Sequence, residues 1–235
     1  MNSKGISGYI IIVLLCLAGA GCGKKVEKAR PVEKKVEEAS QGLQQAPRVS
    51  PPAQVSGPAP GRKVTLYSFE GSAQYWDIPE WAREKQDYTA KSLEVSKDCA
   101  SDGSSSLKLT ADFPGRVWTA ALIELEEYLD WTPYKSVSCD IFIPKDTPEG
   151  LKAKIILTVG EDWKFTEMTS AIFLVPGSWT TVGASLEPDT SDWRMTTVDD
   201  NFRKDVRKIA IRIESNKGPT YAGPIYVDNF RAEER

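Results

Sequence analysis

The chain has 235 residues, with 30 Lys and Arg against 33 Asp and Glu, a formal net charge of −3, and no histidine. The missing histidine excludes catalytic triads and dyads that depend on an imidazole, and it excludes histidine-ligated metal sites. The basic residues are scattered along the sequence and form no stripe of the kind that binds nucleic acid.

The N-terminal segment, residues 1–21, is typical of a bacterial export signal. Lys4 precedes an apolar run, "YIIIVLLCLAGA", which is shorter than the roughly 20 residues that a comfortable membrane-spanning helix needs. The stretch "LAGAGC" resembles the lipobox of bacterial lipoproteins, although Gly19 stands where that pattern prefers a larger aliphatic residue. This resemblance implies cleavage before Cys22 and lipidation of its thiol. An uncleaved anchor and ordinary secretion are the alternatives.

The lipidated cysteine would tether the protein to a membrane of the bacterial cell envelope. Gly23 carries no acidic retention signal, which favours the outer membrane or the cell surface. Residues 22–62 mix both charges and then become rich in Pro, Gln and Ser, so this segment cannot bury a core and is expected to be a disordered linker.

Residues 63–235 are long enough to form one domain with a substantial core. The pattern predicts about ten short strands, and it predicts only short helices in "PEWAREKQ" and "DDNFRKDVRK". In "RKIAIRIE", the isoleucines share one strand face while Ala210, Arg212 and Glu214 share the other, which is typical of a half-buried sheet. The expected fold class is all-β, a β-sandwich or jelly roll. The predicted strands are "KVTLYSFE", "SLEVS", "SSLKLTADF", "RVWTAALIEL", "KSVSCDIFIP", "LKAKIILTV", "FTEMTSAIFL", "SWTTVGASL", "RKIAIRIE" and "PIYVDNF".

Five of these stretches carry a family resemblance. "LYSFEG", "SDGSSSLKL", "YKSVSCDIFIP", "GSWTTVGASL" and "IYVDNF" together resemble the jelly-roll carbohydrate-binding modules of the galactose-binding-like type. The resemblance spans nearly all of residues 63–235 and implies a glycan partner. Relatives of this fold also serve as structural or protein-binding domains.

Catalysis is not favoured by the sequence. Glycoside hydrolysis needs only two carboxylates, and "ELEEYLD" supplies acidic residues from Glu124 to Asp130. These residues are more simply explained as a solvated strand end and loop, and nothing marks a pair as acid and nucleophile. We therefore expect a protein that is not an enzyme.

The seven tryptophans all lie in residues 63–235. Aromatic rings bind sugars by stacking, but they also pack in cores. We expect Trp76 and Trp179 to pack in the core and Trp131 to close a turn. Trp193, in "DTSDWRM", is an alternative exposed ring.

The predicted glycan-binding residues are Trp81, Trp118 and Trp163, with Arg116, Glu124 and Asp140 as hydrogen-bonding partners around the rings. Trp81 and Trp163 fall in expected loops, where binding sites often lie. Trp118 begins a strand and shares its face with Leu122 and Glu124, a mixed surface suited to a partly apolar groove.

Cys16 would be removed with the signal and Cys22 would carry the lipid, which leaves two free cysteines. An oxidising compartment favours a disulfide between Cys99 and Cys139. Cys139, however, alternates with Val137, Ile141 and Ile143 on an expected core face, so a buried free thiol is an equal alternative.

The family resemblance also implies a structural calcium. In similar jelly rolls the first and last strands are adjacent and each supplies an acidic ligand, which here gives Glu70 from "YSFEG" and Asp228 from "IYVDNF". Loop carbonyls near "SDGSSS" would complete the oxygen ligands that calcium requires. The alternative is that both residues cap exposed strand ends.

The sequence therefore predicts a membrane-tethered lipoprotein whose single domain binds a poly- or oligosaccharide. The competing hypothesis is a structural or protein-interaction domain of the cell envelope. An aromatic groove would favour the first, and a flat apolar patch without a groove would favour the second.

Overall fold

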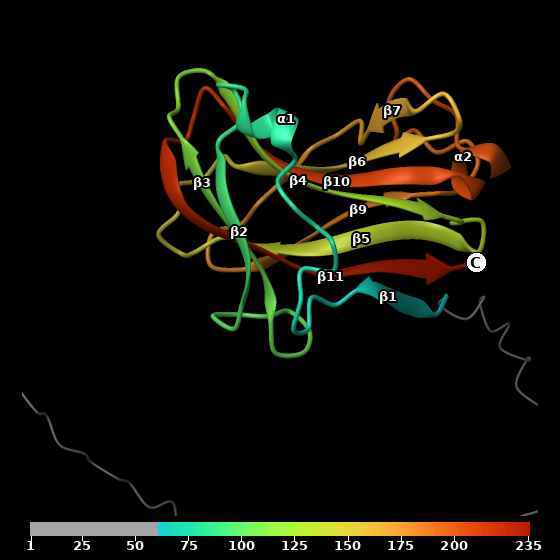
Figure 1. Ribbon diagram of the computed structural model, residues 1–235, viewed down its shortest axis with the longest axis horizontal. Coiled ribbons are helices and arrows are strands. Elements are labelled where there is room, and N and C mark those ends of the chain that lie inside the picture. The colour runs from blue at the N-terminus through green and yellow to red at the C-terminus, as the bar shows by residue number, and fades with distance from the viewer. Residues whose placement is uncertain (1–60) are drawn as a thin grey trace, which may run out of the picture. The chain divides into compact units, whose positions relative to one another are not determined.

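The computed structural model describes residues 61–235, which form two antiparallel β-sheets packed face to face (Figure 1). The expected all-β sandwich is confirmed, with eleven strands where about ten were predicted. The predicted signal peptide, Cys22 and the linker lie outside the described residues. Within residues 61–235, no helix is long and apolar enough to cross a membrane.

The first sheet has six strands in the order β2-β3-β11-β5-β9, with β1 also paired to β11. The long strand β11 pairs with β3 through its first half and with β1 through its second half, so the first and last strands of the domain are adjacent. The strands of this sheet are β1 Lys63–Tyr67, β2 Ala90–Ser96, β3 Ser106–Phe113, β5 Tyr134–Phe142, β9 Trp179–Ser185 and β11 Tyr221–Glu234.

The second sheet has five strands in the order β4-β10-β6-β7, with β8 also paired to β6. Its strands are β4 Trp118–Leu129, β6 Lys152–Val159, β7 Lys164–Glu167, β8 Ile172–Phe173 and β10 Val206–Asn216. The predicted strand "FTEMTSAIFL" is divided between β7 and β8. Between them, Thr169 bonds to the loop that follows β9, donating from its N–H to the Asp192 carbonyl at 2.7 Å and from its hydroxyl to the Ser191 carbonyl at 2.7 Å.

Two short helices lie apart in Figure 1, α1 at the top of the sandwich and α2 at its right-hand end. They are α1 Glu80–Arg83 and α2 Asp200–Lys204, and both fall within the predicted helical stretches. The buried side chain of Ala82 anchors α1 to the domain. In α2, the Asp199 side chain caps the first turn by accepting from the Phe202 N–H at 2.8 Å.

The core fills the space between the sheets. Ile209, Ile211 and Ile213 of β10 are all buried in it, as their alternation predicts, while the intervening side chains face away from the core. Cys139 is fully buried in the same core, and both it and Cys99 are free thiols. The structure therefore supports the buried thiol and does not contain the disulfide.

The expectation for Trp76 is confirmed, and those for Trp179 and Trp193 are wrong. Trp76 is buried, as expected. Trp131 begins a turn, since its carbonyl accepts from the Tyr134 N–H at 3.0 Å, and its side chain is buried. Trp193 is also buried, because its indole N–H donates to the Ser185 carbonyl at 2.7 Å and its ring packs on Phe202, so it is not an exposed ring. Trp179 is only half-buried: Val182 and Ala184 of β9 point into the core, which directs Trp179 to the outer face of its sheet.

Candidate functional site

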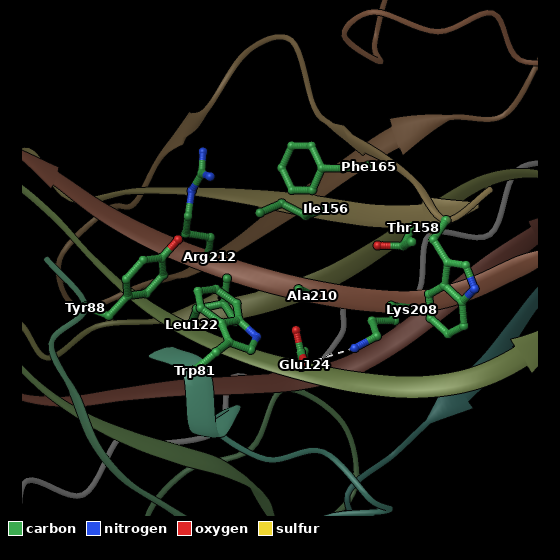
Figure 2. Close-up of a pocket in the computed structure, with 11 residues that line it drawn as sticks. Trp81, Tyr88, Leu122, Glu124, Ile156, Thr158, Phe165, Lys208, Ala210 and Arg212 are labelled. Carbon is green, nitrogen blue, oxygen red and sulfur yellow. Dashed lines mark hydrogen bonds and ion pairs between the residues drawn. The ribbon is translucent and has the colours of Figure 1, made fainter. Parts of the chain in front are cut away.

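A groove of about 320 Å³ crosses the outer face of the five-stranded sheet (Figure 2). Strands β4, β10 and β6 form its floor, because alternate residues of these strands point away from the core. Side chains from α1, from the segment before β2 and from the β6–β7 region form its walls. The lining residues are Trp81, Tyr88, Leu122, Glu124, Ile156, Thr158, Trp163, Phe165, Lys208, Ala210 and Arg212.

The floor of the groove is apolar. Leu122, Ile156 and Ala210 form a hydrophobic cluster that is separate from the main core, and Tyr88 packs against it. Ala210 and Ile156 are cross-strand partners on β10 and β6. The short Ala210 side chain stands between the long side chains of Lys208 and Arg212 on the same strand face, which accounts for the hollow at this point.

Aromatic rings border the floor at both ends. Trp81 and Tyr88 lie on the opposite side of the groove from Lys208 in Figure 2, and their ring centroids are 5.0 Å apart in an edge-to-face arrangement. Trp163 lies toward the Lys208 end, with the Lys208 ammonium 5.8 Å from its ring centroid. Trp163 has a φ of +53° in the turn between β6 and β7, and the Arg207 guanidinium 5.2 Å away packs over its ring.

The charged groups at the Lys208 end are paired with one another. The Lys208 ammonium is 2.9 Å from a Glu126 carboxylate oxygen and 3.5 Å from one of Glu124. The hydrogen bond with Glu126 raises the pKa of Lys208, which keeps this side chain charged. The groove therefore offers hydrogen-bond donors and acceptors side by side with little net charge.

The Arg212 end is held by a buried ion cluster. Glu167 accepts from Arg212 at 2.6 Å, from Arg194 at 2.8 Å and from Lys154 at 3.2 Å. Burial opposes ionisation of Glu167, but the charge of Arg212 and the hydrogen bonds from the three basic side chains outweigh it, so the pKa of this carboxyl is lowered. Arg212 is thereby fixed with its guanidinium 5.7 Å from the Trp118 ring centroid.

Three of the predicted glycan-binding residues, Trp81, Glu124 and Trp163, line the groove. Trp118 lies beside it: its ring is 6.3 Å from that of Tyr88 and contacts Arg212, although Trp118 is not itself a lining residue. The mixed face predicted on its strand is present, because Leu122 also lines the groove.

Asp140 is not placed near the rings as expected, and Arg116 does not line the groove. Asp140 lies on the outer face of the six-stranded sheet, since Cys139 and Ile141 on either side of it point into the core, and it pairs with Arg231 at 2.6 Å. Asp140 is therefore on the opposite side of the sandwich from the rings. Arg116 is in the β3–β4 turn with a φ of +66° and is not a lining residue of the groove.

Most of the floor was missed from the sequence. The alternation in "RKIAIRIE" placed Ala210 and Arg212 on the outer strand face, but it carried no sign that this face borders aromatic rings. Tyr88 and Phe165 lie far apart in the chain. Tyr88 reaches the groove because its segment bridges to Ala120 of β4, and Phe165 because β7 pairs with β6. Phe165 is 58% exposed, but its place in the sequence gives no sign of this.

The two predicted calcium ligands both contact the loop 101–105. Glu70 accepts from the N–H groups of Ser104 at 2.8 Å and Ser105 at 3.0 Å, and these bonds, led by that from the Ser104 hydroxyl, lower the pKa of Glu70 to about 2. Asp228 is fully buried and accepts from the N–H groups of Ser101 at 2.7 Å and of Asp102 at 3.1 Å. Burial raises the pKa of Asp228 against the effect of these bonds.

In this loop N–H groups rather than carbonyl oxygens meet both carboxylates, which weighs against the calcium site. That site stays a prediction. Among residues 61–235, no group of three or more His, Cys, Asp or Glu side chains is arranged to hold a metal ion. The strand-end alternative is wrong for Asp228, which lies within β11 beside a bulge where Asn229 has a φ of +49°.

No protein-family model matches the sequence, and no matching sequence is found among curated proteins. Several solved structures are similar. The chain is 22% identical to CBM27-1 of Caldicellulosiruptor saccharolyticus, solved in complex with mannohexaose, at a TM-score of 0.51 over 73% of this chain and 97% of that one. It is 16% identical to CBM28, a carbohydrate-binding module specific for non-crystalline cellulose, at a TM-score of 0.53 over 75% of this chain and 97% of that one.

An exo-β-agarase also matches at 17% identity and a TM-score of 0.50, but the alignment covers 73% of this chain and only 25% of the enzyme. These likenesses confirm that residues 61–235 have the β-sandwich jelly-roll fold of carbohydrate-binding modules.

Proposed function

We propose that the protein binds a neutral poly- or oligosaccharide in the groove of the five-stranded sheet without cleaving it. The observation that carries the proposal is the combination of an apolar floor with exposed rings at both ends. Sugar rings have apolar C–H faces that stack on aromatic side chains, and they have hydroxyls that need donors and acceptors beside the ring. Trp81 and Trp163 stack on the sugar, while Lys208, Glu124 and Arg212 bond to its hydroxyls.

The paired charges support a neutral ligand. Lys208 is paired with Glu124 and Glu126, and Arg212 with Glu167, so an anionic glycan would find no unpaired cation among these groups and would face Glu124 as well. Of the described residues that line the groove, Glu124 is the single carboxylic acid, whereas glycoside hydrolysis uses two. These features favour binding over cleavage.

The ligands named for the similar structures guide the choice of glycan. One was solved with mannohexaose and another is described as specific for non-crystalline cellulose. At 22% and 16% identity neither specifies the sugar bound by this chain, so the probes should include mannohexaose, cellohexaose and xylohexaose.

The cellular location that we propose rests on the predicted lipobox that ends at Cys22. Cleavage before Cys22 and lipidation of its thiol would tether the domain to a membrane of the bacterial cell envelope, with the outer membrane or cell surface favoured. A structural or protein-interaction role for the domain remains the alternative. The presence of a groove bordered by rings, rather than a flat apolar patch, favours glycan binding.

Isothermal titration of the purified full chain with the three hexasaccharides tests the proposal. Trp81→Ala and Trp163→Ala should each weaken binding by about 1–3 kcal/mol, roughly 5- to 150-fold, as expected for loss of a stacking ring. Phe173→Ala is the matched control, because Phe173 is an exposed ring on β8 that does not line the groove.

Both tryptophans are 39% exposed. The melting temperatures of the two alanine variants should therefore stay close to that of the wild type. Absence of binding to every probe, or equal loss of affinity in the Phe173 variant, would count against the groove as a glycan site.

A further inference from the structure

A second hollow, of about 490 Å³, lies at an open edge of the sandwich. Strand β4 is the edge strand of the five-stranded sheet, and β1 pairs with β11 of the other sheet. The Tyr67 hydroxyl on β1 donates to the Glu127 carboxylate on β4 at 2.7 Å and so joins the two sheets. The hollow above this bond, which we call the edge site, is lined by Leu66, Tyr67, Ser72, Gln74, Tyr75 and Glu127.

Tyr75 is held in water by a strained loop. Its side chain is 93% exposed, and its φ is +67°, while that of the preceding Gln74 is +49°. A left-handed backbone is unfavourable for residues with a side chain, and such positions gather at functional sites. The loop is fixed on both sides, since Trp76 is buried edge-on against the Tyr67 ring at 5.8 Å and Gln74 accepts from the Phe69 N–H at 2.8 Å.

The polar groups around Tyr75 are suited to hydroxyls. Glu127 uses one carboxylate oxygen to accept from Tyr67, and a carboxylate has a second oxygen for other donors. Burial and the neighbouring Glu127 both raise the pKa of the Tyr67 hydroxyl, which keeps it protonated as a donor. Ser72 and the Gln74 amide add further donors to the lining. The negative charge of Glu127 disfavours phosphate and other anions.

We propose that the edge site binds one sugar ring of a glycan, with Tyr75 stacking on its apolar face and Glu127 accepting from its hydroxyls. That the ligand is a glycan rests on the proposed function. The edge site is nevertheless separate from the groove, because no residue lines both. The same loop connects the two: Asp77, two residues after Tyr75, forms a β-bridge with Glu124 of the groove.

Two sites on one domain allow a polysaccharide to be held at two points. The second contact then occurs at a high effective concentration, and the overall affinity exceeds that of either site. Loss of Tyr75 should therefore weaken binding to a long polysaccharide more than binding to a short oligosaccharide that fills only the groove.

The test uses the full chain as wild type, as a groove variant (Trp81→Ala with Trp163→Ala), and as each of these combined with Tyr75→Ala. Mannohexaose, cellohexaose and xylohexaose are the probes, observed by saturation-transfer NMR. The groove variant should retain saturation transfer to a probe that binds the wild type, and adding Tyr75→Ala should abolish it. Tyr75→Phe keeps the ring and should retain the signal. Tyr75 is almost fully exposed, so its replacement should leave the melting temperature unchanged.

The two proposals fail in different ways. A wild type that binds, together with a groove variant that is silent toward every probe, would overturn the edge site and leave the groove standing. A residual signal that survives Tyr75→Ala would also overturn the edge site. Silence of the wild type toward every probe would remove the proposed function and the edge site with it.

Discussion

Glu167 offers a direct test of how the groove is built. It is buried, and it lies 2.6 Å from Arg212, 2.8 Å from Arg194 and 3.2 Å from Lys154. Glu167→Gln preserves the shape of the side chain and removes its charge. The basic groups then remain close together without the carboxylate that compensates them.

The expected loss of stability follows from which of these cations can reach water. The Arg194 side chain is 55% exposed and can turn outward, whereas those of Lys154 and Arg212 are 9% and 12% exposed and cannot. Removing one partner of a buried ion pair typically costs 3–5 kcal/mol. Glu214 still contacts Arg212 at 3.3 Å, so we expect the lower end of that range, about 3 kcal/mol. For a domain of this size that corresponds to a fall in melting temperature of roughly 6–12 °C.

The effect should depend on pH. The pKa of Glu167 is lowered from its ordinary value of 4.5, so its stabilising contribution is complete above that value and is lost as the pH falls through the lower pKa of the folded state. The difference between wild type and Glu167→Gln should therefore be largest near neutral pH and should shrink in acid.

Thermal unfolding of the full chain followed by circular dichroism measures this difference. Glu94→Gln is the control. The Glu94 side chain is 63% exposed, and its carboxylate lies 3.8 Å from the Lys108 ammonium. An exposed ion pair of this kind contributes only about 0–1 kcal/mol to stability. Two results would show that the ion cluster does not stabilise the fold. One is a melting temperature of Glu167→Gln no lower than that of the control at neutral pH. The other is a difference in melting temperature from the wild type that stays the same in acid.

Three further predictions concern cations, thiols and export. Because N–H groups satisfy Glu70 and Asp228, the melting temperature should be the same in chelator and in excess calcium; a fall in chelator that calcium reverses would instead support the calcium site expected from the sequence. Cys139 is buried with a raised pKa, so iodoacetamide should modify it only after unfolding, and a disulfide-linked peptide pair with Cys99 would contradict this. Mass spectrometry of the membrane fraction should find a mature chain that begins at lipidated Cys22, and Cys22→Ser should release the protein from membranes; a Cys22→Ser protein that stays fully membrane-bound would rule out the lipid anchor.

The fold class could be predicted from the sequence because it depends on local pattern. Alternation such as that of Ile209, Ile211 and Ile213 states which residues face the core, and this is set by the geometry of a single strand. The same alternation also indicated that Leu122 and Glu124 share the outer face with Trp118, and that Cys139 points inward. For these residues the chain neighbours alone determine the direction of the side chain.

The site was decided by tertiary structure, because its parts are distant in the sequence. Strand order places Ala210 between Glu124 and Ile156, and the bridge between Tyr88 and Ala120 brings Tyr88 to β4. Asp140 illustrates the limit of the strand pattern. The alternation along β5 predicts that Asp140 points away from the core, but it does not predict which of the two sheets β5 joins. Two sheets have two outer faces, and only the pairing of β5 with β11 and β9 puts Asp140 on the face away from the groove.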